Sequence, residues 1–199
     1  MTAVSATTAA TPSLGVCSFF GSGVLVDIRT SSLSLRGKPT NMIAWHVDLR
    51  TKFGRITIRV EDPRLKAIVS SLDDGAHVWV RGVVERFPNP KKPHGFYILL
   101  TANVMRKCKS YSPRVISFDV KGVVSDRSIA TSRKNRNYMR RVVATANGDL
   151  ICYFHQNKRK GWMIKVGDAV HFAGSVRTGA SYKRTKPTLL QFFHVEQVF

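Results

Sequence analysis

One pattern occurs twice in the chain: GAHVWVRG at residues 75–82 and, 92 positions later, GDAVHFAG at residues 167–174. Both copies fit Gly-x-x-Val-x-φ-x-Gly, where φ is an apolar residue. Three further matches follow in the same order: GVLVD (23–27) with GVVSD (122–126), FGRITI (53–58) with NGDLIC (147–152), and KP (92–93) with KP (186–187). A period of this length indicates two folded domains rather than a solenoid.

Each half of the chain reads as a series of short β-strands. Residues 42–50 and 55–60 alternate between apolar and polar side chains, which is typical of strands with one buried and one wet face. In the second half, Asn147-Gly148 separates two apolar runs and favours a tight hairpin. Residues 63–72 repeat apolar side chains every three or four positions, which predicts a short helix capped by Asp62. The second half has only residues 158–165 here, so its helix is expected to be shorter or absent.

The order in each half is therefore three strands, a helix or loop, and two more strands. This is the order of the OB-fold, a five-stranded, partly open Greek-key barrel. We predict an all-β protein of two tandem OB-fold barrels. An SH3-like barrel is the alternative, and it fits the two long basic loops less well. The expected boundaries are a disordered leader at 1–14, a first domain at 15–110, a linker at 111–115 and a second domain at 116–199.

The charge of the chain indicates an anionic partner. It has 32 Lys and Arg against 12 Asp and Glu, a formal net charge of +20. The excess is spread over both halves, with 16 basic and 7 acidic residues before the linker and 16 basic and 5 acidic residues from the linker onward. A nucleic-acid backbone is the usual partner for such a surface, because each neutralised phosphate releases a counterion. An anionic membrane surface is the weaker alternative.

The cysteines and the apolar runs bear on the cellular compartment of the protein and on membrane association. Cys17, Cys108 and Cys152 are widely spaced and form no CxxC pair, so we expect neither a disulfide framework nor a zinc site. A reducing, intracellular compartment fits: cytoplasm, nucleoid, or a host cell if the protein is encoded by a phage or virus. No apolar run approaches the roughly 18 residues that a membrane span needs. We expect no membrane partner.

The repeated strand and the residues after it resemble the bacterial single-stranded-DNA-binding protein family and its primosomal relatives. The resemblance rests on RGVVERF at 81–87 and AGSVRT at 173–178. It implies an OB-fold, binding of single strands, and multimers that present several barrels. It also implies a stacking ring in the basic hairpin loop, and by position Phe87 and Tyr182 could fill that role. Family members usually have one barrel and an acidic C-terminal tail, whereas this sequence ends at EQVF directly after a strand, which puts tail-mediated recruitment of partners in doubt.

Binding of single strands needs cations along the backbone and flat rings on which bases stack. In an OB-fold these lie on strands two and three and in the loops between strands 1–2 and 4–5. The second 1–2 loop is the most basic stretch, so we expect the second barrel to bind more strongly. The predicted contacts are Arg36, Lys38, Arg50, Arg55, Arg59, Arg86, Phe87, Lys91, Lys92, Arg133, Lys134, Arg136, Tyr138, Arg140, Arg141, Tyr153, Lys158, Arg159, Lys160, Tyr182, Lys183, Arg184 and Lys186.

Alternation within the strands separates core rings from exposed ones. It predicts that Tyr153 stacks on a base while Phe154 is core, and that Trp45 is core. Trp79 points away from its apolar neighbours, so it either stacks on a ligand or forms a contact between barrels or subunits. For Trp162, stacking and closing the bottom of the barrel both remain open.

The sequence carries no recognisable catalytic or cofactor motif. The carboxylates are scattered, the six histidines lack metal-ligand spacing, and no phosphate-cradling glycine motif occurs. We therefore expect a non-enzymatic protein without metal or cofactor. The preferred function is low-specificity binding of single-stranded DNA in replication, recombination or repair, with a homo-oligomer or other replication proteins as possible partners. The alternatives are an RNA binder and a structural adaptor of a nucleoprotein complex.

Overall fold

The computed structural model describes residues 14–35, 38–88, 96–110, 113–131, 137–154, 163–181 and 188–199. The leader and the tips of several loops lie outside these ranges. The described residues include an eight-residue helix and ten strands: β1 (Cys17–Leu35), β2 (Lys38–Thr51), β3 (Gly54–Val60), α1 (Pro63–Ser70), β4 (His77–Pro88), β5 (Phe96–Lys107), β6 (Ile116–Thr131), β7 (Asn137–Ala144), β8 (Leu150–Phe154), β9 (Ala169–Ser181) and β10 (Thr188–Val198).

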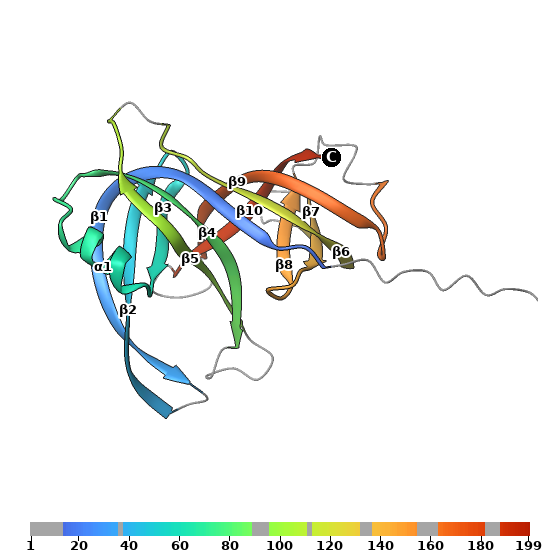
Figure 1. Cartoon of the computed structure of the whole chain (residues 1–199). Coiled ribbons are helices and arrows are strands. Elements are labelled where there is room, and N and C mark those ends of the chain that lie inside the picture. The colour runs from blue at the N-terminus through green and yellow to red at the C-terminus, as the bar shows by residue number, and fades with distance from the viewer. Residues whose placement is uncertain are drawn as a thin grey trace, which may run out of the picture.

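The strands form two barrels that lie side by side (Figure 1). In the first barrel the hydrogen-bonded order is β1-β2-β3-β5-β4, and β4 pairs with β1 to close the ring. The second barrel repeats this order as β6-β7-β8-β10-β9, closed by β9 on β6. In each barrel the third strand runs parallel to the fifth, and the other pairs are antiparallel. The two predicted OB-fold barrels are thus confirmed.

Local sequence accounts for the elements that were predicted. On β3 the residues Ile56, Ile58 and Val60 are fully buried and alternate with polar positions. Helix α1 begins where expected, because the Asp62 carboxylate accepts a hydrogen bond from the backbone N–H of Arg64 at 2.7 Å. Its segment in the second barrel lies largely outside the described residues.

The closing glycine of the repeated pattern has a steric cause. A Cβ on Gly82 would lie 1.9 Å from the carbonyl oxygen of Thr101, and a Cβ on Gly174 would lie 2.0 Å from that of His194. Gly82 stands at a register shift between β4 and β5. Each barrel therefore needs glycine here because the fourth strand packs its backbone directly against the fifth.

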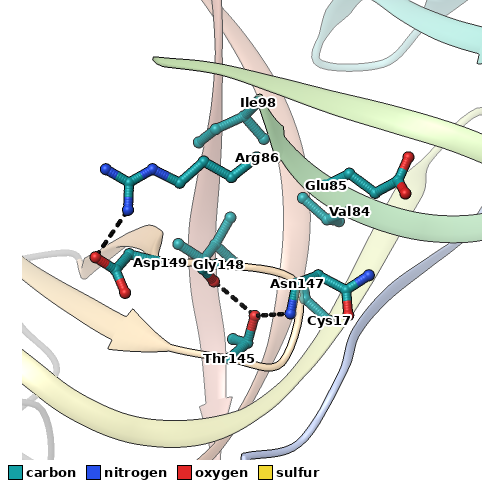
Figure 2. Close-up of a pocket in the computed structure, with 10 residues that line it drawn as sticks. Cys17, Val84, Glu85, Arg86, Ile98, Thr145, Asn147, Gly148 and Asp149 are labelled. Carbon is teal, nitrogen blue, oxygen red and sulfur yellow. Dashed lines mark hydrogen bonds and ion pairs between the residues drawn. The ribbon is translucent and has the colours of Figure 1, made fainter. Parts of the chain in front are cut away.

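A further strand pair joins the barrels. Strands β1 and β6 pair antiparallel, with Phe19 opposite Phe118 at the centre. These two residues are equivalent in the duplication, so a pseudo-two-fold axis passes through the centre of the β1–β6 pairing and relates the two barrels. Two hairpin contacts repeat the symmetry: Thr178 N donates to Phe53 O at 3.0 Å, and the equivalent Arg86 N donates to Asn147 O at 3.3 Å. We call these the Phe53 seam and the Asn147 seam; Figure 2 shows the second one.

The first barrel departs from expectation in one region. The sequence predicted a loop between strands one and two. In the structure the backbone pairing of β1 with β2 continues from Asp27–Asp48 to Leu35–Lys38, so the described residues on either side of positions 36–37 form a long β-hairpin. Figure 1 shows this hairpin projecting well beyond the barrel. Among the described residues, no helix has the length and apolarity to cross a membrane.

Candidate nucleic-acid interface

The outer face of the second barrel carries a row of rings and arginines. Tyr153 on β8 and Phe192 on β10 are both partly exposed and meet edge to face, with ring centroids 5.8 Å apart. Arg140 on β7 pairs with Tyr153, and Arg177 on β9 pairs with Phe192. Two aromatic rings are thus flanked by a guanidinium on each side. Between β7 and β8, the row continues into the partly exposed pair Val142 and Ile151.

Neighbouring side chains fix the position of Arg177. Its Nε donates to Ser175 Oγ at 3.0 Å, and its Nη2 donates to Glu196 Oε1 at 3.1 Å. Burial alone would raise the pKa of Glu196, but hydrogen bonds from Ser175 and Arg177 outweigh it and lower that pKa. Glu196 therefore stays ionised and holds the guanidinium in place at neutral pH.

The outer face of the first barrel is built differently. Asp48 on β2 lies at its centre with a side chain only 1% exposed. Its carboxylate accepts two hydrogen bonds from Arg29, at 2.9 and 2.8 Å, and one from Thr57 Oγ1 at 2.6 Å. Arg55 Nη1 lies 3.6 Å away. The Asp48 carboxylate therefore lowers the net positive charge that this face offers to a phosphate, while Arg55 remains exposed.

His46 lies on the same face, and its surroundings change its pKa. Its imidazole contacts Ser31 Oγ at 2.7 Å. Burial, and then the nearby Arg59 and Arg29, lower the pKa of His46, while Asp48 acts in the opposite direction. His46 is therefore predominantly neutral at physiological pH and adds no cation to this face.

The duplication allows the two faces to be compared position by position. Strand register matches Arg140 with His46, Tyr153 with Arg59, Val142 with Asp48, Phe192 with Leu99, and Arg177 with Glu85. The second barrel thus presents rings and an aliphatic side chain with two arginines. The first presents three charged groups, of which Asp48 pairs with Arg29 and Arg59 with Glu61. Rings suit unpaired bases, which have apolar π faces, better than an internally paired charge network does.

Comparison with known proteins bears on the fold. No family model and no curated protein matches the sequence. The structure is similar to the single-stranded DNA binding protein of Thermus aquaticus, which carries two OB folds in one chain, with a TM-score of 0.68, 12% identity, and coverage of 94% of this chain and 93% of that one. A deletion mutant of that protein matches with a TM-score of 0.69 at 11% identity over 94% of both chains.

The chain is a tandem OB-fold protein. Its likeness to the Thermus aquaticus protein runs through both barrels, since the aligned region covers 94% of the chain. At 12% identity this likeness shows the fold, and the choice of ligand has to be argued from the side chains.

Several predicted contact residues of this tandem OB-fold protein lie on its described surface. Arg50 and Arg55 are exposed and face each other across β2 and β3. Arg86 is exposed and forms an ion pair with Asp149 at 2.9 Å. Arg140 lies 3.6 Å from Asp126.

Two predicted contact residues are buried and are withdrawn from the interface. Arg141 was predicted to contact nucleic acid, but β7 begins at Asn137, and strand alternation turns Arg141 into the second barrel. It is fully buried, and its guanidinium donates to the carbonyl oxygen of Ile164 at 3.3 Å. Arg59 lies on the outer side of β3, as predicted, yet it is only 7% exposed and pairs with Glu61.

Alternation correctly predicted two core rings, and stacking of a base on Tyr153 stays a prediction. Phe154 is fully buried and Trp45 packs against the core, so both core predictions are confirmed. Tyr153 is partly exposed. Trp79 is partly buried, and Arg106 of the neighbouring strand β5 lies 4.7 Å from its ring centroid, so its described contact is within one barrel.

The remaining predicted contacts cannot be placed. For Lys38, Phe87 and Tyr138 only the backbone in β2, β4 and β7 is described. The others lie outside the described residues, as does Trp162: Arg36, Lys91, Lys92, Arg133, Lys134, Arg136, Lys158, Arg159, Lys160, Tyr182, Lys183, Arg184 and Lys186. The sequence reasoning in turn missed Arg29, Phe53, Arg177 and Phe192. Alternation around the buried Phe193 would have placed Phe192 on the outer face.

Substitution of Asp48 tests whether the outer face of the first barrel contacts the strand. We expect Asp48→Asn to increase affinity for single-stranded DNA severalfold at low salt and to steepen the salt dependence, because Arg29 and Arg55 lose the Asp48 carboxylate, while Arg29 keeps Asp27. The same change should lower the free energy of unfolding by about 1.5–3 kcal/mol, the usual loss of hydrogen bonds to a charged group. Unchanged or weaker binding in a folded variant would show that this face does not contact the strand.

Proposed function

We propose that the protein binds single-stranded DNA with little sequence preference, as an accessory in replication, recombination or repair. The observation that supports this best is the row of Tyr153 and Phe192 between Arg140 and Arg177. A stacked base is worth about 1–3 kcal/mol whatever its identity. The formal charge of +20 adds a general attraction for phosphates.

The binding we propose involves no chemical step. Bases would stack on the rings of the second barrel, while Arg140 and Arg177 would contact phosphates at the edges of the row. Arg50 and Arg55 on the first barrel are exposed and would add backbone contacts there. The free thiols of Cys17, Cys108 and Cys152 favour work in a reducing, intracellular compartment.

The decisive experiment is a titration with poly-dT, poly-U and a duplex of matched length at two salt concentrations. If the chain neutralises about six phosphates, affinity for poly-dT should fall about 300-fold between about 50 and 200 mM salt, from a slope of about 0.7 per contact. Fluorescence anisotropy of a labelled strand measures this directly. Tight binding that salt does not weaken would contradict the proposal.

The other arms of the titration separate the alternatives. Clearly tighter binding of poly-U than of poly-dT would make the protein an RNA binder, since the side chains that face the strand do not by themselves exclude a 2′-hydroxyl. A preference for duplex would favour a structural adaptor of a nucleoprotein complex. Mass measurement of the free protein in the same buffer tests for a homo-oligomer.

A further inference from the structure

The Phe53 seam joins the two outer faces. Phe53 lies at the turn between β2 and β3 of the first barrel, and its carbonyl oxygen accepts a hydrogen bond from Thr178 N of β9 at 3.0 Å. Thr178 Oγ1 in turn donates to the carbonyl oxygen of Arg55 at 2.6 Å. Three hydrogen-bonded residues therefore fix this turn of the first barrel against the second.

Two cationic side chains lie near the ring of Phe53. The Arg177 guanidinium lies 4.4 Å from its centroid and Lys52 Nζ lies 5.8 Å from it. The ring is partly exposed, and Lys52 and Arg55 on either side are exposed. Because Glu196 and Ser175 hold Arg177, the ring is packed against a fixed support. A ring fixed in this way loses little freedom when a base stacks on the part that Arg177 leaves uncovered.

The same contact extends the row on the second barrel. Tyr153 meets Phe192, Phe192 pairs with Arg177 across β10 and β9, and Arg177 covers Phe53. Two ring contacts and one strand pairing thus lead from the second barrel to the turn of the first. Beyond the turn, Arg55 and Arg50 continue the row onto the first barrel.

The Asn147 seam is equivalent in backbone and opposite in chemistry. Asn147 replaces Phe53, Asp149 replaces Arg55, and Glu85 replaces Arg177. Figure 2 shows Arg86 reaching Asp149, with a salt bridge of 2.9 Å, while the Glu85 carboxylate points away from this pair. The small pocket at this seam has a volume of about 10 Å³, far below the range of typical ligand sites. Two carboxylates, Glu85 and Asp149, against the single guanidinium of Arg86 make the net charge of these three residues negative, which disfavours a phosphate backbone. The side chain at the turn offers no ring.

We propose that a single strand passes between the barrels at the Phe53 seam, with one base stacked on Phe53, and does not cross at the Asn147 seam. This rests on the proposed function and adds to it a defined path and a stacking residue. Lys52 and Arg55 take the phosphates on either side of the stacked base. The ligand class is a single-stranded oligonucleotide long enough to touch both barrels.

The matched pair Phe53→Ala and Asn147→Ala tests the path. With an oligonucleotide of about 35 thymidines, Phe53→Ala should weaken binding between about 5- and 150-fold, the range for one stacked base, whereas Asn147→Ala should bind like the parent protein. An oligonucleotide of about eight thymidines fits one barrel and should lose much less. Equal losses in both variants, or no loss in Phe53→Ala, would overturn the path.

A second variant separates stacking from packing at the seam. Phe53→Trp should restore binding and add a fluorescence signal that the stacked base quenches, measured as the difference from the parent protein. Absence of added quenching on saturation with the long strand would overturn the stacking role, even if Phe53→Ala proved unstable. If the parent protein itself binds no single strand, the proposed function fails and the path fails with it; if only the Phe53 variants behave like the parent, the path alone fails.

Discussion

Replacing Gly82 or Gly174 with alanine should lower the free energy of unfolding by about 3 kcal/mol or more. The added methyl group would lie 1.9 Å or 2.0 Å from a carbonyl oxygen of the adjacent strand. Backbone atoms cannot rotate away as a side chain does, so the fourth and fifth strands would have to separate and lose ladder hydrogen bonds. Urea denaturation of the full chain, followed by circular dichroism, measures the change.

Gly75→Ala is the matched control for this prediction. Gly75 has a φ of +79°, and a Cβ built there meets nothing within 4 Å. Only the cost of the left-handed backbone applies, about 1–2 kcal/mol. If Gly82→Ala lost no more stability than Gly75→Ala, the close strand approach would not be the reason for the repeated glycine.

The largest effect on binding is expected from the double substitution Tyr153→Ala with Phe192→Ala. Removing two stacking rings should weaken binding of a long thymidine strand by about 2–4 kcal/mol, roughly 100-fold. No charge is removed, so the slope of log affinity against log salt should stay as in the parent protein. Fluorescence anisotropy over a salt series gives both quantities from one set of titrations.

Phe20→Ala controls for the loss of an exposed ring elsewhere. Phe20 is 46% exposed on β1, on the sheet that the two barrels share, away from the proposed row. It should leave the affinity unchanged. Affinity of the double variant equal to that of the parent would remove the second barrel's outer face from the binding model, and a flatter salt slope would mean that the rings act by positioning cations.

The fold was predictable because its determinants are local and repeated. The glycine of the repeated strand reports a close backbone approach, Asp62 caps α1, and alternation buries Phe154 while leaving Tyr153 on the outer face. Each of these follows from a few neighbouring residues. The duplication then made the first barrel a guide to the second.

The interface was predictable only in part, because side-chain parity and ion pairing depend on non-local structure. The orientation of Arg141 depends on β7 beginning at Asn137, which a basic, polar stretch does not reveal. The hydrogen bonds between Arg29 and Asp48 join β1 to β2, and the register of this strand pair cannot be derived from the sequence. Phe53 and Arg177 are far apart in the chain, and no sequence pattern signals that they stack.

The strand pairing of Phe19 with Phe118 has a consequence for how the two halves can diverge. Were this arrangement assembled from two identical polypeptides, every substitution at one turn would appear at the other, and a ring could not stand opposite an acid. Covalent fusion lifts that constraint while keeping the shared central ladder. The two seams can therefore carry different side chains, so that the two sides of the molecule differ in chemistry while the backbone remains nearly symmetric.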